Sequence, residues 1–81
     1  MVIHESAEDY LESILVLRER RGIVHSIDIV NELGFSKPSV SIAMKKLREN
    51  GYISMDPDGS ITLNESGLAI ASRIYDRHKT I

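Results

Sequence analysis

The chain has 81 residues, of which 42% are hydrophobic and 27% charged, so it has room for one small domain, and it has no cysteine for disulfides or thiolate metal sites. Its longest apolar run, residues 14–17, is far below the roughly 20 residues of a membrane span, and its start lacks the basic and then apolar order of a signal peptide, so we expect a cytoplasmic protein without a membrane partner. The net charge of −2 hides a local polarity, because residues 36–51 carry four cations and one acid whereas residues 1–12 carry four acids and no Lys or Arg.

The first predicted element is a helix over about residues 7–21. Ser6 is a suitable N-cap, and apolar side chains recur at i, i+4 and i+7 from Tyr10. Gly22 predicts the end of this helix, since glycine readily adopts the left-handed conformation that closes many helices. Residues 23–24 then suit a short strand.

Two short helices joined by a tight turn are predicted next. A brief helix opens at Ser26 or Ile27 and ends at Gly34. Only Gly34, Phe35 and Ser36 separate it from the following helix, which begins at Lys37-Pro38, where the fixed φ of proline is tolerated in a first turn. Two helices separated by a short Gly-containing turn are typical of a helix-turn-helix.

The third predicted helix, which ends at Asn50-Gly51, has two chemically different sides. Its apolar side chains at helical spacing are Val40, Ala43, Met44 and Leu47. Its opposite side carries Pro38, Ser41, Ile42, Lys45 and Lys46. The first set predicts the buried side, and the second predicts a solvent-exposed side with cations, a hydroxyl and a branched apolar side chain.

A β-hairpin and a last helix complete the predicted fold. Residues 52–55 and 60–63 are β-prone and flank the turn sequence of residues 56–59, in which Pro57 presets φ and Gly59 accepts a positive φ. Asn64 is expected to cap a helix over about Glu65 to His78. The residues expected to share one side of it are Leu68, Ala71, Tyr75 and His78. The fold class is therefore mainly α with a small β-hairpin, a winged helix-turn-helix that occupies residues 1–81 as one domain.

Nine residues at the third predicted helix are candidates for DNA contact. The start of a helix can direct hydroxyls and N–H groups at phosphates, and cations along its side can neutralise the flanking backbone. Ile42 and Pro38 offer no side-chain hydrogen bonds, so on an exposed face they suit thymine methyl groups. Lys46 and Arg48 suit the phosphate backbone and would position the protein. The candidates are Ser36, Lys37, Pro38, Ser39, Ser41, Ile42, Lys45, Lys46 and Arg48.

Two other interpretations stay open from the residues alone. The cations of this helix could simply solvate its outer side, as most charged residues do. The domain could also be a winged-helix protein–protein interaction module without metal sensing, since the net charge is −2 and the predicted hairpin tip carries Asp56 and Asp58. The arrangement of helices and hairpin favours double-stranded DNA as the partner. No nucleophile–base pair, phosphate-cradling glycine loop or complete metal site indicates an enzyme.

Asp9, Glu12 and His78 form a second candidate site, for a metal ion. Asp9 and Glu12 are three residues apart on the first predicted helix and so lie on one side of it. Two carboxylates beside an imidazole would suit Mn²⁺ or Fe²⁺. The alternative is that both acids are merely solvated near a helix start, and spacing alone does not link His78 to them.

Several segments together resemble a known family along nearly the whole chain. These segments are residues 6–14, 28–30 with Leu33, 36–41, 46–47, 49–52, 63–67 and 77–78. They are similar to the N-terminal DNA-binding domain of the manganese transport regulator and diphtheria toxin repressor family of iron-dependent repressors. The resemblance implies a metal-responsive bacterial transcription repressor that binds palindromic operators as a homodimer.

The resemblance also assigns residues. It implies that Asp9, Glu12 and His78 stand where manganese-sensing members hold metal ligands, and that an acid at position 9 resembles the manganese branch, because the iron branch has methionine there. It further implies that the operator faces Ser36, Pro38, Ser39, Ser41 and Ile42.

The chain departs from the family pattern in three ways. Family members continue into a helical dimerisation domain that supplies further metal ligands. We expect this domain to be absent from the chain, and therefore an incomplete metal site and weak Mn²⁺ binding at most. Family members commonly have Glu shortly after the histidine, where this chain has Lys79 and Thr80, and Ser where Ile27 stands. Homodimerisation is therefore expected of the longer family protein.

Overall fold

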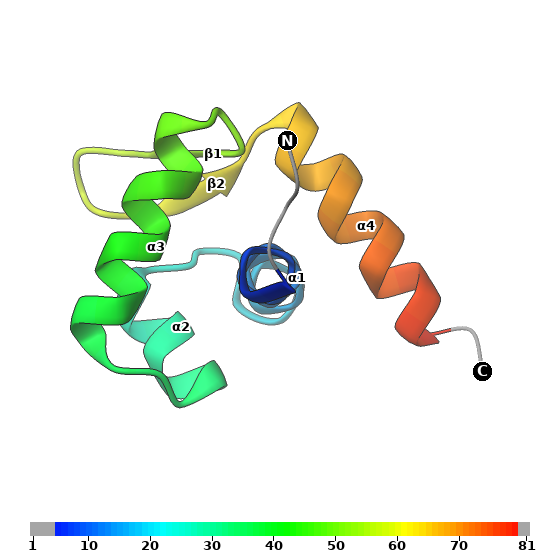
Figure 1. Cartoon of the computed structure of the whole chain (residues 1–81), viewed down its shortest axis with the longest axis horizontal. Helices are drawn as coiled ribbons and strands as arrows, with labels where there is room; N and C mark the ends of the chain where they lie inside the picture. The colour runs from blue at the N-terminus through cyan, green and yellow to red at the C-terminus, as the bar shows by residue number, and fades with distance from the viewer. Residues whose placement is uncertain (1–4, 80–81) are drawn as a thin grey trace.

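The computed structural model of the chain describes residues 5–79, and the side chains of residues 7–77. These residues form four helices and a hairpin, and Figure 1 shows how they are arranged. Their order is α1 (Glu5–Arg21), α2 (Ser26–Leu33), α3 (Lys37–Glu49), β1 (Ile53–Met55), β2 (Ile61–Leu63) and α4 (Glu65–Lys79). This order confirms the predicted winged helix-turn-helix, which is mainly helical.

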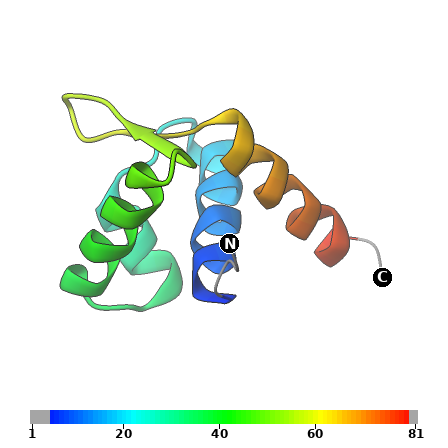
Figure 2. The ribbon, with the colours of Figure 1, turned by 45° about the horizontal axis from the view of Figure 1, so that its top comes forward.

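Helix α1 is the central element of the fold. It stands between α2, α3 and the hairpin on one side and α4 on the other (Figures 1 and 2), and it contacts all three other helices and β2. Leu11 and Ile14 are therefore completely buried. The core residues are Tyr10, Leu11, Ile14, Leu15, Leu17, Val24, Ile29, Val40, Met44, Leu47, Ile53, Ile61, Leu63 and Ala71. Gly22 ends the helix as predicted, with a φ of 85° and its N–H donating to the Arg18 carbonyl.

Capping residues set the ends of the helix-turn-helix. Helix α2 begins at Ser26, and its N-cap is His25, whose backbone N–H donates to the Asp28 carboxylate at 2.9 Å. Gly34 ends α2 with a φ of 74°, a left-handed conformation in which glycine has no steric penalty. Ser36 then caps α3 by accepting the Ser39 N–H. The turn between α2 and α3 is consequently only three residues long.

The hairpin packs its apolar side on the helical core. Strands β1 and β2 are antiparallel with Ile53 opposite Leu63 and Met55 opposite Ile61. Ile53, Ile61 and Leu63 are buried. The strand predicted at residues 23–24 is reduced to one bridge, in which the Ile61 N–H donates to the Val24 carbonyl at 2.7 Å.

Helix α4 differs from its prediction in the side that it buries. Its buried stripe runs through Gly67, Ala71 and Ile74, while Leu68 is 37% exposed at the edge of that stripe. Tyr75 is partly buried against the core, and the predicted fourth member, His78, lies outside the described side chains. A Cβ atom at position 67 would overlap the Tyr52 carbonyl, so Gly67 permits a close approach of α4 to the segment just before β1. No helix in the described part of the chain has the length and apolar character to cross a membrane.

Candidate nucleic-acid interface

The two sides of α3 have the predicted environments. Val40, Met44 and Leu47 are buried against the core, and Ala43 is half-buried. All nine candidate DNA-contact residues are exposed. Ile42 is 58% exposed, which is high for a branched apolar side chain at the middle of a helix. The exposed residues Pro38, Ser41, Ile42, Lys45 and Lys46 are called the outer face of α3 below.

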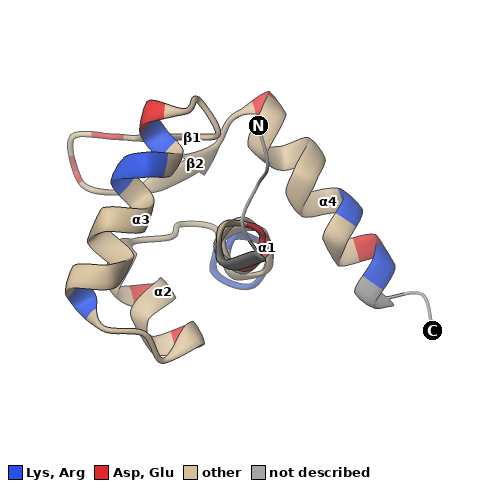
Figure 3. Ribbon diagram, in the orientation of Figure 1, with Lys and Arg blue, Asp and Glu red and all other residues tan. Residues whose placement is uncertain are grey.

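The three lysines of α3 carry positive charge that no acid in the described part of the chain pairs with. Figure 3 shows basic residues at both ends of this helix, with acidic residues confined to its last turn, α2 and the hairpin loop nearby. Across residues 7–77, the side chains of Lys37, Lys45 and Lys46 have no ion pair or hydrogen bond. By contrast, two arginines at the end of α1 lie 3.6 and 3.1 Å from carboxylates of α2. The lysines of α3 are thus free to pair with an external anion such as a phosphate.

Arg48 differs from the three lysines because it points toward the hairpin. Its Nη1 atom lies 3.9 Å from the Met55 sulfur in β1. The guanidinium therefore covers the junction between α3 and the hairpin, where it remains exposed. This location suits the predicted role of positioning on a phosphate backbone more than that of reading bases.

Two of the three candidate hydroxyls have a structural role. The Ser36 hydroxyl donates to the Ser39 hydroxyl at 2.8 Å, and Ser36 Oγ accepts the Ser39 N–H at 3.3 Å. These bonds hold the first turn of α3, as expected of an N-cap. Ser41 lies one turn further on and is exposed toward α2.

The hairpin tip is acidic. The Ser60 N–H donates to Asp58 at 2.9 Å, and the Ser60 hydroxyl lies 2.8 Å from Asp58 and 3.1 Å from Asp56. The backbone bond from Ser60, and then its hydroxyl, lower the pKa of Asp58, and the nearby His25 adds a smaller effect in the same direction. The tip therefore stays negatively charged at neutral pH, which disfavours close contact with phosphates.

The candidate metal ligands are only partly described. Asp9 is exposed and Glu12 is half-buried on α1, and the His78 side chain lies outside the described residues. Carboxylate oxygens suit a hard divalent ion, so the chemistry of these two donors fits Mn²⁺ or Fe²⁺. Among residues 7–77, no three His, Asp or Glu side chains converge on a possible metal position.

Comparisons with known proteins agree with this architecture. Residues 3–61 match the family described as iron dependent repressor, N-terminal DNA binding domain. An uncharacterized HTH-type transcriptional regulator of Methanocaldococcus jannaschii is 37% identical over 78 residues, which are 95% of this chain and 62% of that protein. The transcriptional regulator MntR of Salmonella typhimurium is 31% identical over 77 residues, covering 95% of this chain and 49% of MntR.

A third relative extends the same pattern. The HTH-type transcriptional regulator MntR of Geobacillus thermodenitrificans is 30% identical over 76 residues, which are 94% of this chain and 54% of that protein. The chain thus spans between about half and 62% of the length of these relatives. With its order of helices and hairpin and a family match over most of its length, the chain belongs to the iron-dependent repressor family and has the fold of that family's N-terminal DNA-binding domain.

Proposed function

We propose that the chain is the sequence-specific DNA-binding module of a bacterial transcription repressor, and that it inserts the outer face of α3 into the major groove of a palindromic operator. The observation that carries this proposal is the exposure of that face together with its two lysines, which have no ion pair among the side chains of residues 7–77. A helix fits the width of the major groove, about 12 Å in B-DNA. Exposed cations on a helix of this diameter can reach the phosphates that border the groove.

The residues of the outer face divide by chemistry. Lys45 and Lys46 would neutralise phosphates, a contact that adds affinity without sequence preference. Ile42 and Pro38 would contact thymine methyl groups, which are the apolar feature of the major groove. The capping pair Ser36 and Ser39 would place the start of α3 against the backbone of one DNA strand.

Metal regulation is the second part of the proposal. Asp9 and Glu12, with His78, would supply oxygen and nitrogen ligands for Mn²⁺, and further ligands would come from the longer repressor, which acts as a homodimer in the cytoplasm. The relatives named MntR support a manganese-type regulator. Calorimetry should find weak Mn²⁺ binding that Asp9→Ala removes, and tight binding that survives Asp9→Ala would contradict the assignment.

A titration tests the DNA proposal. A duplex selected from a random library and a scrambled duplex are titrated at two salt concentrations, followed by fluorescence anisotropy. Lys45→Gln and Lys46→Gln should each weaken binding and reduce the salt slope by about one, because each removes one phosphate contact. Arg73→Gln on the exposed surface of α4 is the matched control and should change neither quantity. Absence of binding to either duplex at low salt would exclude the proposal.

A protein-binding module is the second candidate function. The acidic hairpin tip with Asp56 and Asp58 favours it, because this surface repels phosphates. It would be supported if the titration shows no DNA binding.

The relatives are named as transcriptional regulators and not as enzymes, which agrees with the prediction that the chain has no catalytic role.

A further inference from the structure

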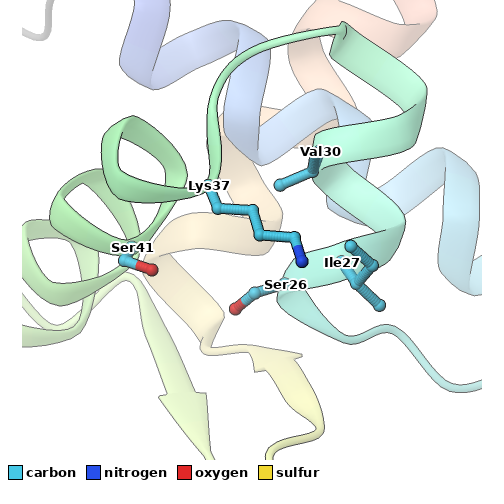
Figure 4. Close-up of a pocket in the computed structure, with 5 residues that line it drawn as sticks. All are labelled: Ser26, Ile27, Val30, Lys37 and Ser41. Atoms are coloured by element: carbon cyan, nitrogen blue, oxygen red, sulfur yellow. The ribbon is translucent and has the colours of Figure 1, made fainter.

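Arg48 and Met55 form a contact between α3 and the hairpin that the proposed function does not use. Arg48 Nη1 lies 3.9 Å from the Met55 sulfur, at the surface of the domain. Among the described side chains, no carboxylate lies within ion-pair distance of Arg48. Lys37, at the opposite end of α3, extends instead into a pocket between α3 and the α2 residues Ser26 and Ile27 (Figure 4). Of the α3 cations, Arg48 is thus the one that contacts a sulfur.

Met55 is the methionine that an oxidant reaches most easily in the described part of the chain. The chain has three methionines and no cysteine, so an oxidant finds thioether sulfur and no thiol. Met44 is 1% exposed in the core, whereas Met55 is half-buried on β1 and its contact with Arg48 lies at the surface. Met1 lies outside the described residues. Oxidation is therefore expected at Met55 before Met44.

A hydroperoxide such as hydrogen peroxide would convert this thioether into a sulfoxide. A lone pair of the sulfur attacks one peroxide oxygen, an S–O bond forms, and the O–O bond breaks. The leaving oxygen takes the proton of the transferred oxygen and departs as water, so the sulfur is oxidised by two electrons and the peroxide is reduced. The product carries a polar oxygen where the thioether was only a weak hydrogen-bond acceptor.

A sulfoxide oxygen at this position would accept a hydrogen bond from Arg48. An N–H···O bond from a charged donor is about 2.7–2.9 Å long. Such a bond and an S–O bond, meeting at an angle, together span a distance similar to the 3.9 Å between Nη1 and the sulfur. The oxygen would therefore fit between the two groups while the backbone stays in place.

Holding Arg48 at the hairpin would remove a cation from the operator backbone. A phosphate that binds the guanidinium would have to break a charge-assisted hydrogen bond, instead of displacing a weak contact with sulfur. Lys45 and Lys46 have no hydrogen bond or ion pair among the side chains of residues 7–77. Oxidation would therefore affect one phosphate contact and leave those of the two lysines unchanged.

We propose that Met55 is a modification site for peroxides, and that its sulfoxide holds Arg48 against the hairpin and thereby weakens operator binding. This inference rests on the proposed DNA-binding function. The modification is reversible, because methionine sulfoxide reductases restore the thioether.

Oxidation of the purified chain with hydrogen peroxide tests the site. Peptide mass spectrometry should find one added oxygen on Met55 before any on Met44. Anisotropy titration with the selected duplex should then show an affinity reduced by about threefold to tenfold and a salt slope reduced by about one. Methionine sulfoxide reductase should restore both quantities. Oxidation of Met44 before Met55, or an unchanged affinity once Met55 is oxidised, would overturn the inference.

Three variants separate the role of Arg48 from general damage to the hairpin. Met55→Leu keeps the apolar volume, so it should bind DNA like the unoxidised wild type and lose no affinity with peroxide. Arg48→Gln should lower the affinity and the salt slope by itself, and oxidation should have no further effect on it. Lys45→Gln is the matched control, because it also removes one phosphate contact but keeps Arg48, so oxidation should retain its full effect.

Two outcomes of the variant series would contradict the inference and leave the proposed function in place. A loss of affinity on oxidation that persists in Arg48→Gln would show that the sulfoxide acts through the packing of the hairpin. A loss that persists in Met55→Leu would place the modification elsewhere. Thermal melts followed by circular dichroism check that each oxidised protein is folded. Failure of the unoxidised wild type to bind any duplex would overturn both the inference and the proposed function.

Discussion

The backbone carbonyl of Tyr52 lies against Gly67, so that a Cβ atom at position 67 would overlap it. The same carbonyl accepts the Asn64 N–H at 2.9 Å. The neighbouring Gly51 carbonyl accepts hydrogen bonds from the Asn64 side-chain amide and the Ser66 hydroxyl, each at 3.0 Å. The start of α4 is thereby bound to the segment that leads from α3 into the hairpin. The side chain of Asn64, expected to cap α4, donates to the Gly51 carbonyl and accepts from the Ser54 hydroxyl at 2.7 Å.

Gly67→Ala should destabilise the domain by about 1–3 kcal/mol, because the added methyl group must displace a backbone carbonyl. Chemical denaturation with urea measures the change. Ala69→Gly, at an exposed position of the same helix, is the matched control and should cost about 1 kcal/mol through helix propensity alone. If Gly67→Ala stabilised the domain by that amount, the close approach of Tyr52 would be contradicted.

Asp28→Ala should lower the free energy of unfolding by about 1–2 kcal/mol, because Asp28 accepts the backbone N–H of the N-cap residue and pairs with Arg21 at 3.1 Å. Its side chain is only 15% exposed. Glu32→Ala, which breaks a more exposed pair with Arg20 at 3.6 Å, should cost less than about 0.5 kcal/mol. Thermal or urea unfolding of both variants would contradict the capping role if the two losses were equal.

Ser13→Ala should stabilise the domain by about 1 kcal/mol. The Ser13 side chain is 5% exposed, and its hydroxyl has no hydrogen-bond partner in the described part of the chain. Removal of an unsatisfied buried hydroxyl and the higher helix propensity of alanine act in the same direction. Ser66→Ala, which loses a hydroxyl bonded to Gly51, should have the opposite sign. A loss of stability in Ser13→Ala would show that its hydroxyl has a partner.

The lowered pKa of Asp58 predicts how the hairpin tip responds to acid. The pKa of Asp58 is lower in the folded than in the unfolded chain, so the ionised carboxylate stabilises the fold at pH values above its unfolded-state pKa. This stabilisation is lost as the pH falls through the folded-state pKa. NMR titration of the side-chain carboxyl carbon should show this lowered pKa. Ser60→Ala should raise it only partly toward the ordinary value, since the larger effect comes from the Ser60 backbone N–H. A pKa equal to that of an unfolded peptide would contradict the hydrogen bonds at the tip.

Local chemistry predicted the elements of the domain from the sequence. Gly34 and Pro38 mark the two sides of the helix-turn-helix turn, and the positive φ of 80° at Gly51 and of 87° at Gly59 follows the predicted helix end and hairpin turn. The two sides of α3 were also predictable, because apolar spacing decides which side of a helix faces a core. The outer face of α3 and the exposure of Ile42 could therefore be predicted from the sequence alone.

Contacts between residues that are distant in the sequence decided the features that local chemistry did not predict. His25 as the cap of α2, the buried side of α4 with Ile74, and the pocket between Lys37 and Ile27 all depend on how elements pack. Periodicity identifies a helix face only to within about one residue, or 100°. The close approach of Gly67 to the Tyr52 carbonyl is one such contact, because a Cβ atom at position 67 would overlap that carbonyl and only glycine fits there.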